Sequence, residues 1–277
     1  MTHVLVTGAT GFVGRHVVRA LTSAGASVVA VVRSTVDAAH DTRLPSGTTI
    51  VTTTDLFTES AAWWQQQCAG VDVIVHAAWY AEPGRYLQAP QNIDCLIGSL
   101  NLARGAGLAG VRRFVGIGTC FEYDLAPGLL SLDTPLKPLT PYAAAKASLF
   151  TMLSQWLPLQ SVEFAWCRLF YLHGEGEDER RLVPYLRKQL ARGEPAELSH
   201  GTQIRDFLDV VDAARKIATV ALGTLQGPLN ICSGVPVTVR ELALSIAAEY
   251  GRPDLLNFGS RPDNLVDPPR VVGVPSL

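Results

Sequence analysis

The chain has 277 residues, of which 48% are hydrophobic and 17% are charged, and its formal net charge at pH 7 is −2. This length suits one large α/β domain or two small lobes around a buried core. A nearly neutral chain with no dense basic block is not expected to bind nucleic acid. No apolar run reaches the ~20 residues that cross a bilayer, so we expect no membrane partner either.

The cysteines are scattered and odd in number, and none forms a CxxC pair. This pattern argues against a disulfide framework and against a zinc site, so we predict reduced thiols and no bound metal. The chain enters a predicted strand within its first residues, without a leader-like segment, which predicts a cytoplasmic location. The five cysteines are Cys68, Cys95, Cys120, Cys167 and Cys232.

Short β-prone runs alternate with helical patterns over the first 170 residues. Strands are predicted at residues 3–6, 27–32, 48–53, 71–76, 114–117 and 164–169. Helices are predicted at residues 13–24, 93–106 and 141–157. Buried strands that alternate with helices predict a parallel sheet covered on both faces, which is the doubly wound α/β (Rossmann) fold.

The residue composition of the sequence changes after residue 172. An acidic, glycine-containing run is followed by a basic helix at 182–192 and by many prolines. We therefore predict a dinucleotide-binding domain at 1–172 and, over most of 173–277, a smaller substrate-binding lobe. A helix at about 206–222 is expected to return to the first domain. The lobe would close over the carboxyl edge of the sheet, where open α/β sheets bind ligands.

Three glycines separate the first strand from the first helix, in the stretch TGATGFVG. Gly8 permits a tight turn, Gly11 lets a pyrophosphate approach the backbone, and Gly14 lets the helix pack closely. The free N–H groups at the helix N-terminus would bind the phosphates. The pattern predicts a dinucleotide site, whose loop residues are Gly8, Thr10, Gly11, Phe12, Val13 and Gly14.

A tyrosine and a lysine four residues apart begin the predicted helix 141–157. Residues i and i+4 share a helix face, so the Lys146 ammonium is expected near the Tyr142 phenol, where it would lower the phenol's pKa. A tyrosine tuned in this way exchanges protons near neutral pH. Thr119 ends the fifth strand and would hydrogen-bond a substrate carbonyl. The predicted catalytic residues are therefore Thr119, Tyr142 and Lys146, and the last two are also expected to contact the cofactor.

The GxxGxxG spacing, Thr119 and the YxxxK pair together resemble the extended short-chain dehydrogenase/reductase superfamily. Its members include NAD(P)-dependent nucleotide-sugar epimerases, dehydratases and ketoreductases, and the resemblance covers nearly the whole chain. His76-Ala77-Ala78 is similar to the family's fourth-strand motif, which implies that Ala77 and Ala78 lie beside the cofactor. We interpret His76 itself as a structural histidine.

The same resemblance extends to the substrate side. The stretch that ends in Arg205-Asp206-Phe207 resembles the family's G-x-x-x-R-D-F segment, whose arginine lies near the nucleotide diphosphate. Arg261 resembles a second diphosphate-contacting arginine. Arginine suits phosphate because its planar fork donates two hydrogen bonds. The resemblance also implies a homodimer formed through the helices 93–106 and 141–157.

The end of the second strand predicts the choice of cofactor. NAD enzymes place an acidic residue there for the ribose hydroxyls, but this chain has Arg33, which could pair with a 2′-phosphate. We therefore predict NADP(H), with NAD(H) as the alternative. Asp55 and Leu56, after the third strand, resemble the family's adenine-contacting pair.

Departures from the family pattern narrow the reaction. The family's 4,6-dehydratases carry Asp-Glu directly after the catalytic threonine, where this chain has Cys120 and Phe121, so sugar dehydration is not expected. Cys120 would instead line the substrate pocket. Glu122, one position further on, is a candidate second acid or ligand of a substrate hydroxyl. Trp79 would line the sugar pocket, with core packing as the alternative.

We predict an NADPH-dependent ketoreductase that acts on a nucleoside-diphosphate 4-keto-6-deoxyhexose. The hydride would come from nicotinamide and the proton from Tyr142. The first alternative is an NAD(P)-dependent nucleotide-sugar C4 epimerase of the same family. The second is a non-catalytic NADP-binding redox sensor, which would not need the catalytic residues.

Overall fold

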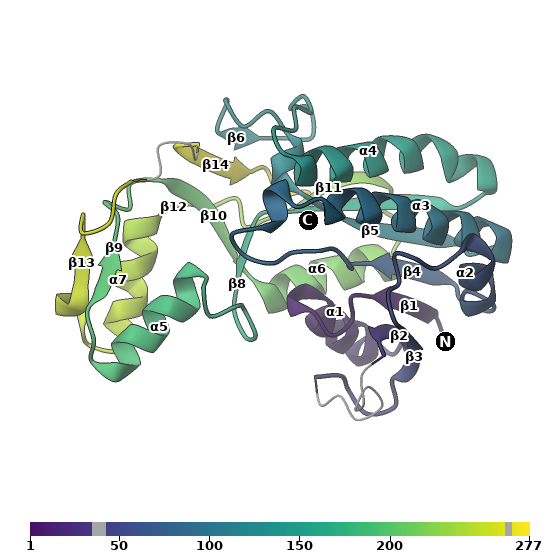
Figure 1. Cartoon of the computed structure of the whole chain (residues 1–277), viewed down its shortest axis with the longest axis horizontal. Coiled ribbons are helices and arrows are strands. Elements are labelled where there is room, and N and C mark those ends of the chain that lie inside the picture. Colours follow the sequence, from purple (N-terminus) through teal and green to yellow (C-terminus); the bar gives the residue numbers. More distant parts are fainter. Residues whose placement is uncertain (35–42, 264–267) are drawn as a thin grey trace.

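A parallel sheet of seven strands forms the centre of the structure, a computed structural model that describes residues 1–34, 43–263 and 268–277 (Figure 1). The strands are β1 (His3–Thr7), β2 (Ser27–Arg33), β3 (Thr49–Thr53), β4 (Val73–His76), β5 (Arg113–Thr119), β7 (Glu163–Leu169) and β11 (Gly227–Ile231). Their order in the sheet is β11-β7-β5-β4-β1-β2-β3, and all neighbours are parallel. The predicted doubly wound sheet is confirmed.

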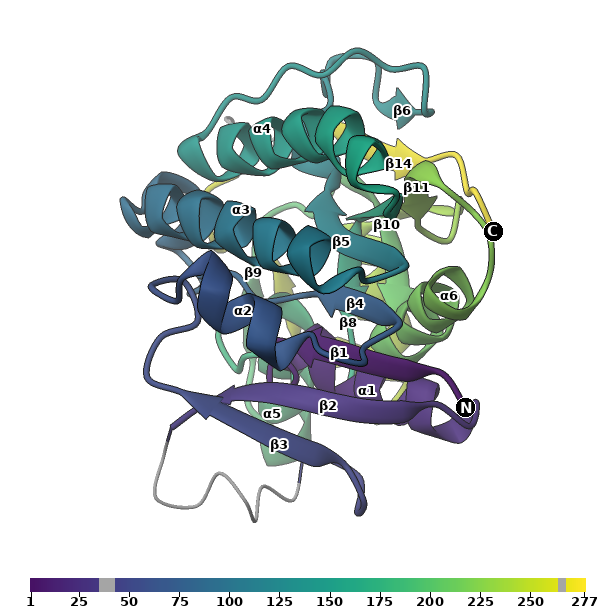
Figure 2. The same ribbon diagram turned by 90° about the vertical axis from the view of Figure 1, so that its right-hand side faces the viewer.

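Helices cover both faces of this sheet, as Figure 2 shows. One face carries α1 (Phe12–Ser23) and α6 (Val210–Leu222), and the other carries α2 (Ala61–Gln67), α3 (Gln91–Ala109) and α4 (Pro141–Trp156). The side chains of β1 alternate between the two cores: Val4 and Val6 pack toward α1 and α6, while Leu5 packs toward the other helices. The predicted strands and helices of the first 172 residues agree with the structure to within a few residues.

The predicted helix at 206–222 is wrong over its first four residues. Residues Ile204–Asp209 form strand β10, and α6 begins only at Val210. Asp209 ends the strand and caps the helix, because its carboxylate accepts the backbone N–H of Val211 at 2.7 Å. As expected, α6 packs on the central sheet, through Ala214 and Ile217 among others. Strand β11 also joins the central sheet, although it lies within the predicted lobe.

A second sheet and two helices lie beyond the carboxyl ends of the central strands (Figure 1). Strand β10 pairs with β8 (Tyr171–His173), β12 (Pro236–Thr238) and β14 (Arg270–Gly273), and β14 pairs with β6 (Leu129–Leu130). Helices α5 (Leu182–Arg192) and α7 (Val239–Glu249) pack on the short strands β9 (Ala196–Leu198) and β13 (Leu256–Phe258). Single 3₁₀ turns occur at η2 (Tyr86–Gln88), η3 (Cys120–Glu122), η4 (Pro158–Gln160) and η5 (Pro253–Leu255).

The structure also describes the cysteine thiols and the length and polarity of the helices. All five cysteine thiols are free and buried. Within the described ranges, no helix is both long enough and apolar enough to span a bilayer.

Candidate active site

A cleft of about 1430 Å³ is lined both by residues at the carboxyl ends of the central strands and by residues of the outer lobe. It is larger than the roughly 300–1,000 Å³ typical of a site for one small ligand. Every predicted site residue except Glu122 lines this cleft. These residues are Gly8, Thr10, Gly11, Phe12, Val13, Gly14, Arg33, Asp55, Leu56, Ala77, Ala78, Trp79, Thr119, Cys120, Tyr142, Lys146, Arg205 and Arg261.

The glycine turn is built by close backbone approach. Gly8 has φ +68°, and a Cβ there would lie 2.7 Å from the backbone nitrogen of Ala78. A Cβ on Gly14 would lie 2.0 Å from the carbonyl oxygen of Gly8. Gly14 thus lets α1 pack on the turn itself. Helix α1 begins after Gly11 with no side-chain cap among the described residues, so its first N–H groups face the cleft unbonded by side chains.

His76 ties the ends of β1 and β4 to α3. Ser99 donates its only hydroxyl hydrogen to the carbonyl oxygen of Cys95 at 2.6 Å, so it accepts from His76 Nε2 at 2.7 Å. The other ring nitrogen, Nδ1, therefore accepts from the Thr7 hydroxyl, also at 2.7 Å. Burial, followed by the charge of Lys146, lowers the pKa of His76 to about 3. This geometry fits the neutral, structural histidine that we inferred from the sequence.

Tyr142 stands in an aromatic enclosure above the end of β5. Its ring packs edge-on against Tyr86 and Trp79, with centroids 4.8 and 6.4 Å away. Burial raises the pKa of the Tyr142 phenol above its usual value, an effect that hydrogen bonding to Thr119 partly offsets. The spacing of Tyr142 and Lys146 predicted that the lysine would lower this pKa. In the structure desolvation dominates, because aromatic rings close over the phenol.

The Lys146 side chain takes a different direction from the one expected. Its Nζ donates to the carbonyl oxygen of Ile117 at 2.6 Å and lies 3.8 Å from the ring centroid of Trp79. Burial lowers the pKa of Lys146 to about 7, although Glu122 opposes this shift. Trp79 is itself fixed, because its indole N–H donates to Asn92 Oδ1 at 2.8 Å. Trp79 thus both lines the cleft and packs on Lys146.

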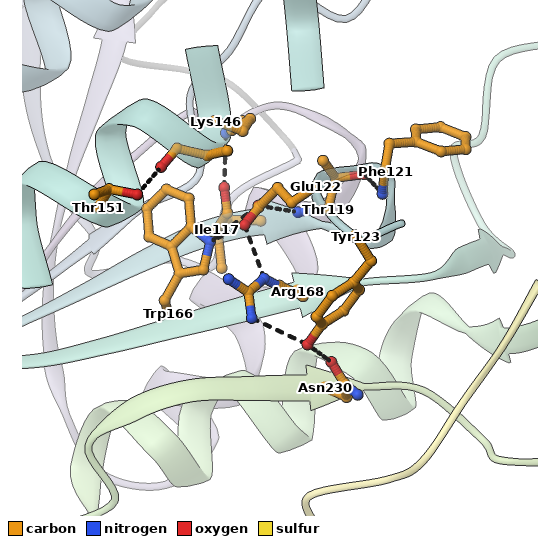
Figure 3. Close-up of polar contacts among 11 residues, drawn as sticks. Ile117, Thr119, Phe121, Glu122, Tyr123, Lys146, Thr151, Trp166, Arg168 and Asn230 are labelled. Carbon is orange, nitrogen blue, oxygen red and sulfur yellow. Dashed lines mark hydrogen bonds and ion pairs between the residues drawn. The ribbon is translucent and has the colours of Figure 1, made fainter. Parts of the chain in front are cut away.

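Glu122 does not reach the cleft. It is fully buried, and its carboxylate pairs with Arg168 at 2.8 Å (Figure 3). It also accepts the Thr119 backbone N–H and the Trp166 indole N–H. The structure therefore does not support Glu122 as a ligand of a substrate hydroxyl. Sequence reasoning missed this because Arg168 lies on β7, far along the chain.

Two arginines of the outer lobe line the cleft, and each lies against an aromatic ring. The guanidinium of Arg205 lies 5.2 Å from the ring centroid of Tyr171, and that of Arg261 lies 4.9 Å from the ring of Tyr185. Arg33 also lines the cleft and is exposed where β2 ends. The lining of the cleft thus combines these three arginines with Thr119, Tyr142 and Lys146.

Sequence reasoning missed two further residues of the cleft. Tyr86 packs on Tyr142 from η2, and its place in a loop gave no periodic signal. Glu177 comes from the acidic run after residue 173, and burial raises the pKa of its carboxyl to about 7. One of its oxygens is buried without a hydrogen bond. Its burial depends on the packing of that loop against α1, through Arg15 and Gly176.

The fold and the cleft together define an NAD(P)-dependent oxidoreductase of the Rossmann type. More narrowly, the chain belongs to the NAD dependent epimerase/dehydratase family, whose model matches residues 4–232. This confirms the resemblance drawn from the sequence.

Individual relatives are similar over most of their length. The chain is 24% identical to the dTDP-6-deoxy-L-talose 4-dehydrogenase (NAD(+)) of Aggregatibacter actinomycetemcomitans, over 90% of each protein. It is 26% identical to the dTDP-6-deoxy-L-talose 4-dehydrogenase (NAD(P)(+)) of Kitasatospora kifunensis, over 94% of this chain and 83% of that protein. The UDP-glucose 4-epimerase of Thermus thermophilus, solved in complex with NAD, has the same fold. It aligns with a TM-score of 0.84 and 23% identity over 99% of this chain and 91% of that one.

Proposed function

We propose that this protein is an NADPH-dependent ketoreductase of a nucleoside-diphosphate 4-keto-6-deoxyhexose. The observation that carries the proposal is the meeting of Thr119, Tyr142 and Lys146 beside the glycine turn. Two relatives are named as 4-dehydrogenases of a dTDP-linked 6-deoxyhexose. Oxidation of the C4 alcohol and reduction of the 4-ketone are the same reaction in opposite directions.

Thr119 is oriented to donate. Its hydroxyl oxygen accepts the Phe121 backbone N–H at 3.3 Å, so its hydrogen is left for another acceptor. A keto oxygen placed between Thr119 and Tyr142 would accept a hydrogen bond from each. Both bonds strengthen as negative charge develops on that oxygen, and this lowers the barrier to reduction.

Tyr142 would supply the proton. Burial keeps its phenol neutral, which is the form that an acid needs. The nicotinamide cofactor, when bound, supplies a hydride to the carbonyl carbon. Tyr142 gives its proton to the carbonyl oxygen, and the ketone becomes an alcohol. The Lys146 ammonium, which now donates to the Ile117 carbonyl oxygen, would have to turn toward Tyr142 to stabilise the phenolate that remains.

The glycine turn and the end of β2 fit a phosphorylated dinucleotide. The uncapped N-terminus of α1 offers N–H groups to a diphosphate. Arg33 would pair with a 2′-phosphate, while Asp55 and Leu56 would lie beside the adenine. This supports NADP(H) as the preferred cofactor. NAD(H) stays the alternative, since the names of the two relatives include NAD(+) and NAD(P)(+).

The wall beside Thr119 disfavours elimination of water. Cys120 is buried, and the ring of Phe121 packs edge-on against Tyr171 at 6.2 Å. Neither side chain can act as the acid or base that a dehydratase needs. An apolar wall here suits a sugar that has already lost its C6 hydroxyl.

A homodimer through α3 and α4 is also part of the proposal. These two helices lie side by side on the outside of the molecule in Figures 1 and 2. Their outer faces expose Ile93, Ile97 and Met152, which are 64%, 53% and 51% exposed. Pairing these helices with those of a second copy would bury this apolar surface.

The test is to mix the purified protein with dTDP-4-keto-6-deoxyglucose and either NADPH or NADH, and to follow oxidation of the cofactor. We expect rapid oxidation of NADPH, slower oxidation of NADH, and a 4-hydroxy product. Interconversion of two sugar nucleotides without net oxidation would assign an epimerase instead. Cofactor binding with no turnover of any sugar nucleotide would favour the redox sensor.

A further inference from the structure

We propose that Glu122 is a positioning residue for the proton-donating site. Its carboxylate lies behind β5, where it holds Thr119 in place and supplies a negative charge that acts on Lys146 and Tyr142. The kinetic consequence rests on the proposed function, but the physical consequence can be measured without substrate or cofactor. No contact between Glu122 and a ligand is required.

The carboxylate is held by three donors from two neighbouring strands, Thr119 at the end of β5 and Trp166 and Arg168 on β7 (Figure 3). Oε1 accepts the backbone N–H of Thr119 at 2.8 Å and the indole N–H of Trp166 at 3.0 Å. Oε2 accepts Arg168 Nε at 2.8 Å. The bond to Thr119 closes a capping box, in which Thr119 caps η3 while Glu122 returns to the Thr119 amide. Moving the carboxylate would therefore move the Thr119 hydroxyl.

The strand behind the site leaves space for this arrangement. A Cβ on Gly116 would lie 2.3 Å from Trp166 Cζ3. A Cβ on Gly118 would lie 2.2 Å from Trp166 Nε1 and 2.4 Å from Glu122 Oε1. The two glycines alternate with Ile117 on β5, so one face of the strand is cleared for an indole and a carboxylate. The sequence G-I-G-T is thus matched to Glu122 and Trp166.

Arg168 balances the buried charge and is itself fixed. Its Cζ lies 4.6 Å from the ring centroids of both Tyr123 and Phe150. Its Nη1 donates to the Tyr123 hydroxyl at 3.0 Å, and that hydroxyl donates to Asn230 Oδ1 at 2.8 Å. The Glu122–Arg168 pair therefore has no net charge, and the Glu122 carboxylate is the group that faces Thr119.

The negative end also acts on Lys146. The Lys146 Nζ lies 5.9 Å from the ring of Trp166, whose indole N–H bonds the carboxylate. The titratable groups that interact electrostatically with Lys146 are Glu122, Cys95 on α3 and His76 on β4. Glu122 raises the pKa of Lys146 more than Cys95 does, and Glu122 also raises the pKa of Tyr142. Loss of its charge should lower both pKa values.

The experiment titrates Lys146 by NMR in the full chain labelled with ¹³Cε-lysine, without ligands. The chain has four lysines, and Lys146→Met assigns the resonance. Glu122→Gln leaves the Arg168 cation uncompensated and should lower the Lys146 pKa by roughly one unit. Glu122→Gln combined with Arg168→Gln removes both charges and should give an intermediate value. Tyr123→Phe alters the same network without changing any charge and should leave the pKa in place.

The proposal predicts that the Lys146 pKa is highest in the wild type, lower in the double variant and lowest in Glu122→Gln. An unchanged pKa in Glu122→Gln would overturn it, as would a shift of equal size in Tyr123→Phe. If Glu122→Gln does not fold, the double variant is the test. A Lys146 pKa in the double variant that equals the wild-type value would then overturn the proposal. With substrate, Glu122→Gln should lower kcat about tenfold and leave KM within about twofold. If no sugar nucleotide is turned over, the proposed function fails while the titration still tests the role of Glu122.

Discussion

The two walls of the cleft are built in different ways. On the sheet side, Thr119 and Lys146 are 6% and 2% exposed, and backbone bonds and packed rings hold them. On the lobe side, two arginines rest on aromatic rings: Arg261 is exposed and lies on Tyr185, whereas Arg205 is buried and lies on Tyr171. A rigid, dry wall suits chemistry that needs fixed geometry, whereas a wall of stacked cations suits binding of a polyanion. Changes at the proposed proton-donating site on the sheet side should therefore lower kcat, changes at the glycine turn should weaken cofactor binding, and changes on the lobe side should raise KM.

The largest effect is expected on the sheet side, from Tyr142→Phe. This change removes the proposed proton donor and keeps the ring that packs on Tyr86 and Trp79. We expect kcat to fall roughly 10²–10⁴-fold, the usual contribution of a general acid. A fluorescence titration should give an unchanged dissociation constant for the cofactor. A variant with more than a tenth of wild-type kcat would refute the role of Tyr142.

Gly14→Ala should damage the cofactor end of the same wall. The new Cβ would lie 2.0 Å from the Gly8 carbonyl oxygen, so the turn must move. Overpacking of this kind costs about 1–3 kcal/mol, and we expect a 10- to 100-fold loss of cofactor affinity by calorimetry. Gly107→Ala is the matched control, because its Cβ would meet only the flexible side chain of Gln160 at 3.3 Å and the tip of Trp156 at 3.5 Å. Equal affinity losses in both variants would contradict this account.

On the lobe side, Arg261→Ala should raise KM for the nucleotide sugar about tenfold, the value of one charge-assisted hydrogen bond. Its kcat should stay within about twofold of wild type. Arg240→Ala is the control, since Arg240 also lies on an aromatic ring, 3.9 Å from that of Phe258, but does not line the cleft. A fall in kcat without a rise in KM would remove the distinction between the two walls.

Arg33→Ala should change cofactor preference by a smaller factor. Arg33 is exposed, and exposed ion pairs contribute at most about 1 kcal/mol. We expect the ratio of kcat/KM for NADPH over NADH to fall about fivefold, mostly through NADPH. If the ratio does not change, the basis for an NADP(H) preference is lost.

Lys146→Met should stabilise the fold in a pH-dependent way. Burial lowers the pKa of Lys146 from 10.5 to about 7, so between these values the unfolded chain binds more protons than the folded one. The folded state therefore becomes more stable as the pH rises from about 7 to 10.5. Below about pH 7 the buried Lys146 ammonium destabilises the fold by its full amount. Melting temperatures should show a larger gain for Lys146→Met at pH 6 than at pH 10. The exposed Lys137→Met should show no such difference, and a gain that is equal at both pH values for Lys146→Met would contradict the buried cation.

The sequence predicts those parts of the site that lie on strand ends and on one helix face. The Gly8 turn, Thr119 at the end of β5, and Tyr142 with Lys146 all follow from local spacing, and parallel strands bring their carboxyl ends to one edge. Strand β10 was missed because the helical pattern from Val210 onward was extended back through Asp209.

Interactions between distant segments could not be predicted. Glu122 is read as a pocket residue from its position after Thr119, but its partner Arg168 lies on another strand. The direction of the Tyr142 pKa shift likewise depends on Tyr86 and Trp79, which pack against its ring from the segment between β4 and α3, far from Tyr142 along the chain. Desolvation is a property of the packed site, so residue spacing alone gave the wrong sign.

The most direct test of the central claim is to follow the reacting hydrogen. The protein would be incubated with dTDP-4-keto-6-deoxyglucose and NADPH deuterated on the transferred face of C4, and the product sugar examined by NMR and mass spectrometry. Our account predicts one deuterium at C4 of the sugar for each NADPH oxidised. A product without deuterium, or sugar interconversion with no cofactor oxidised, would contradict it.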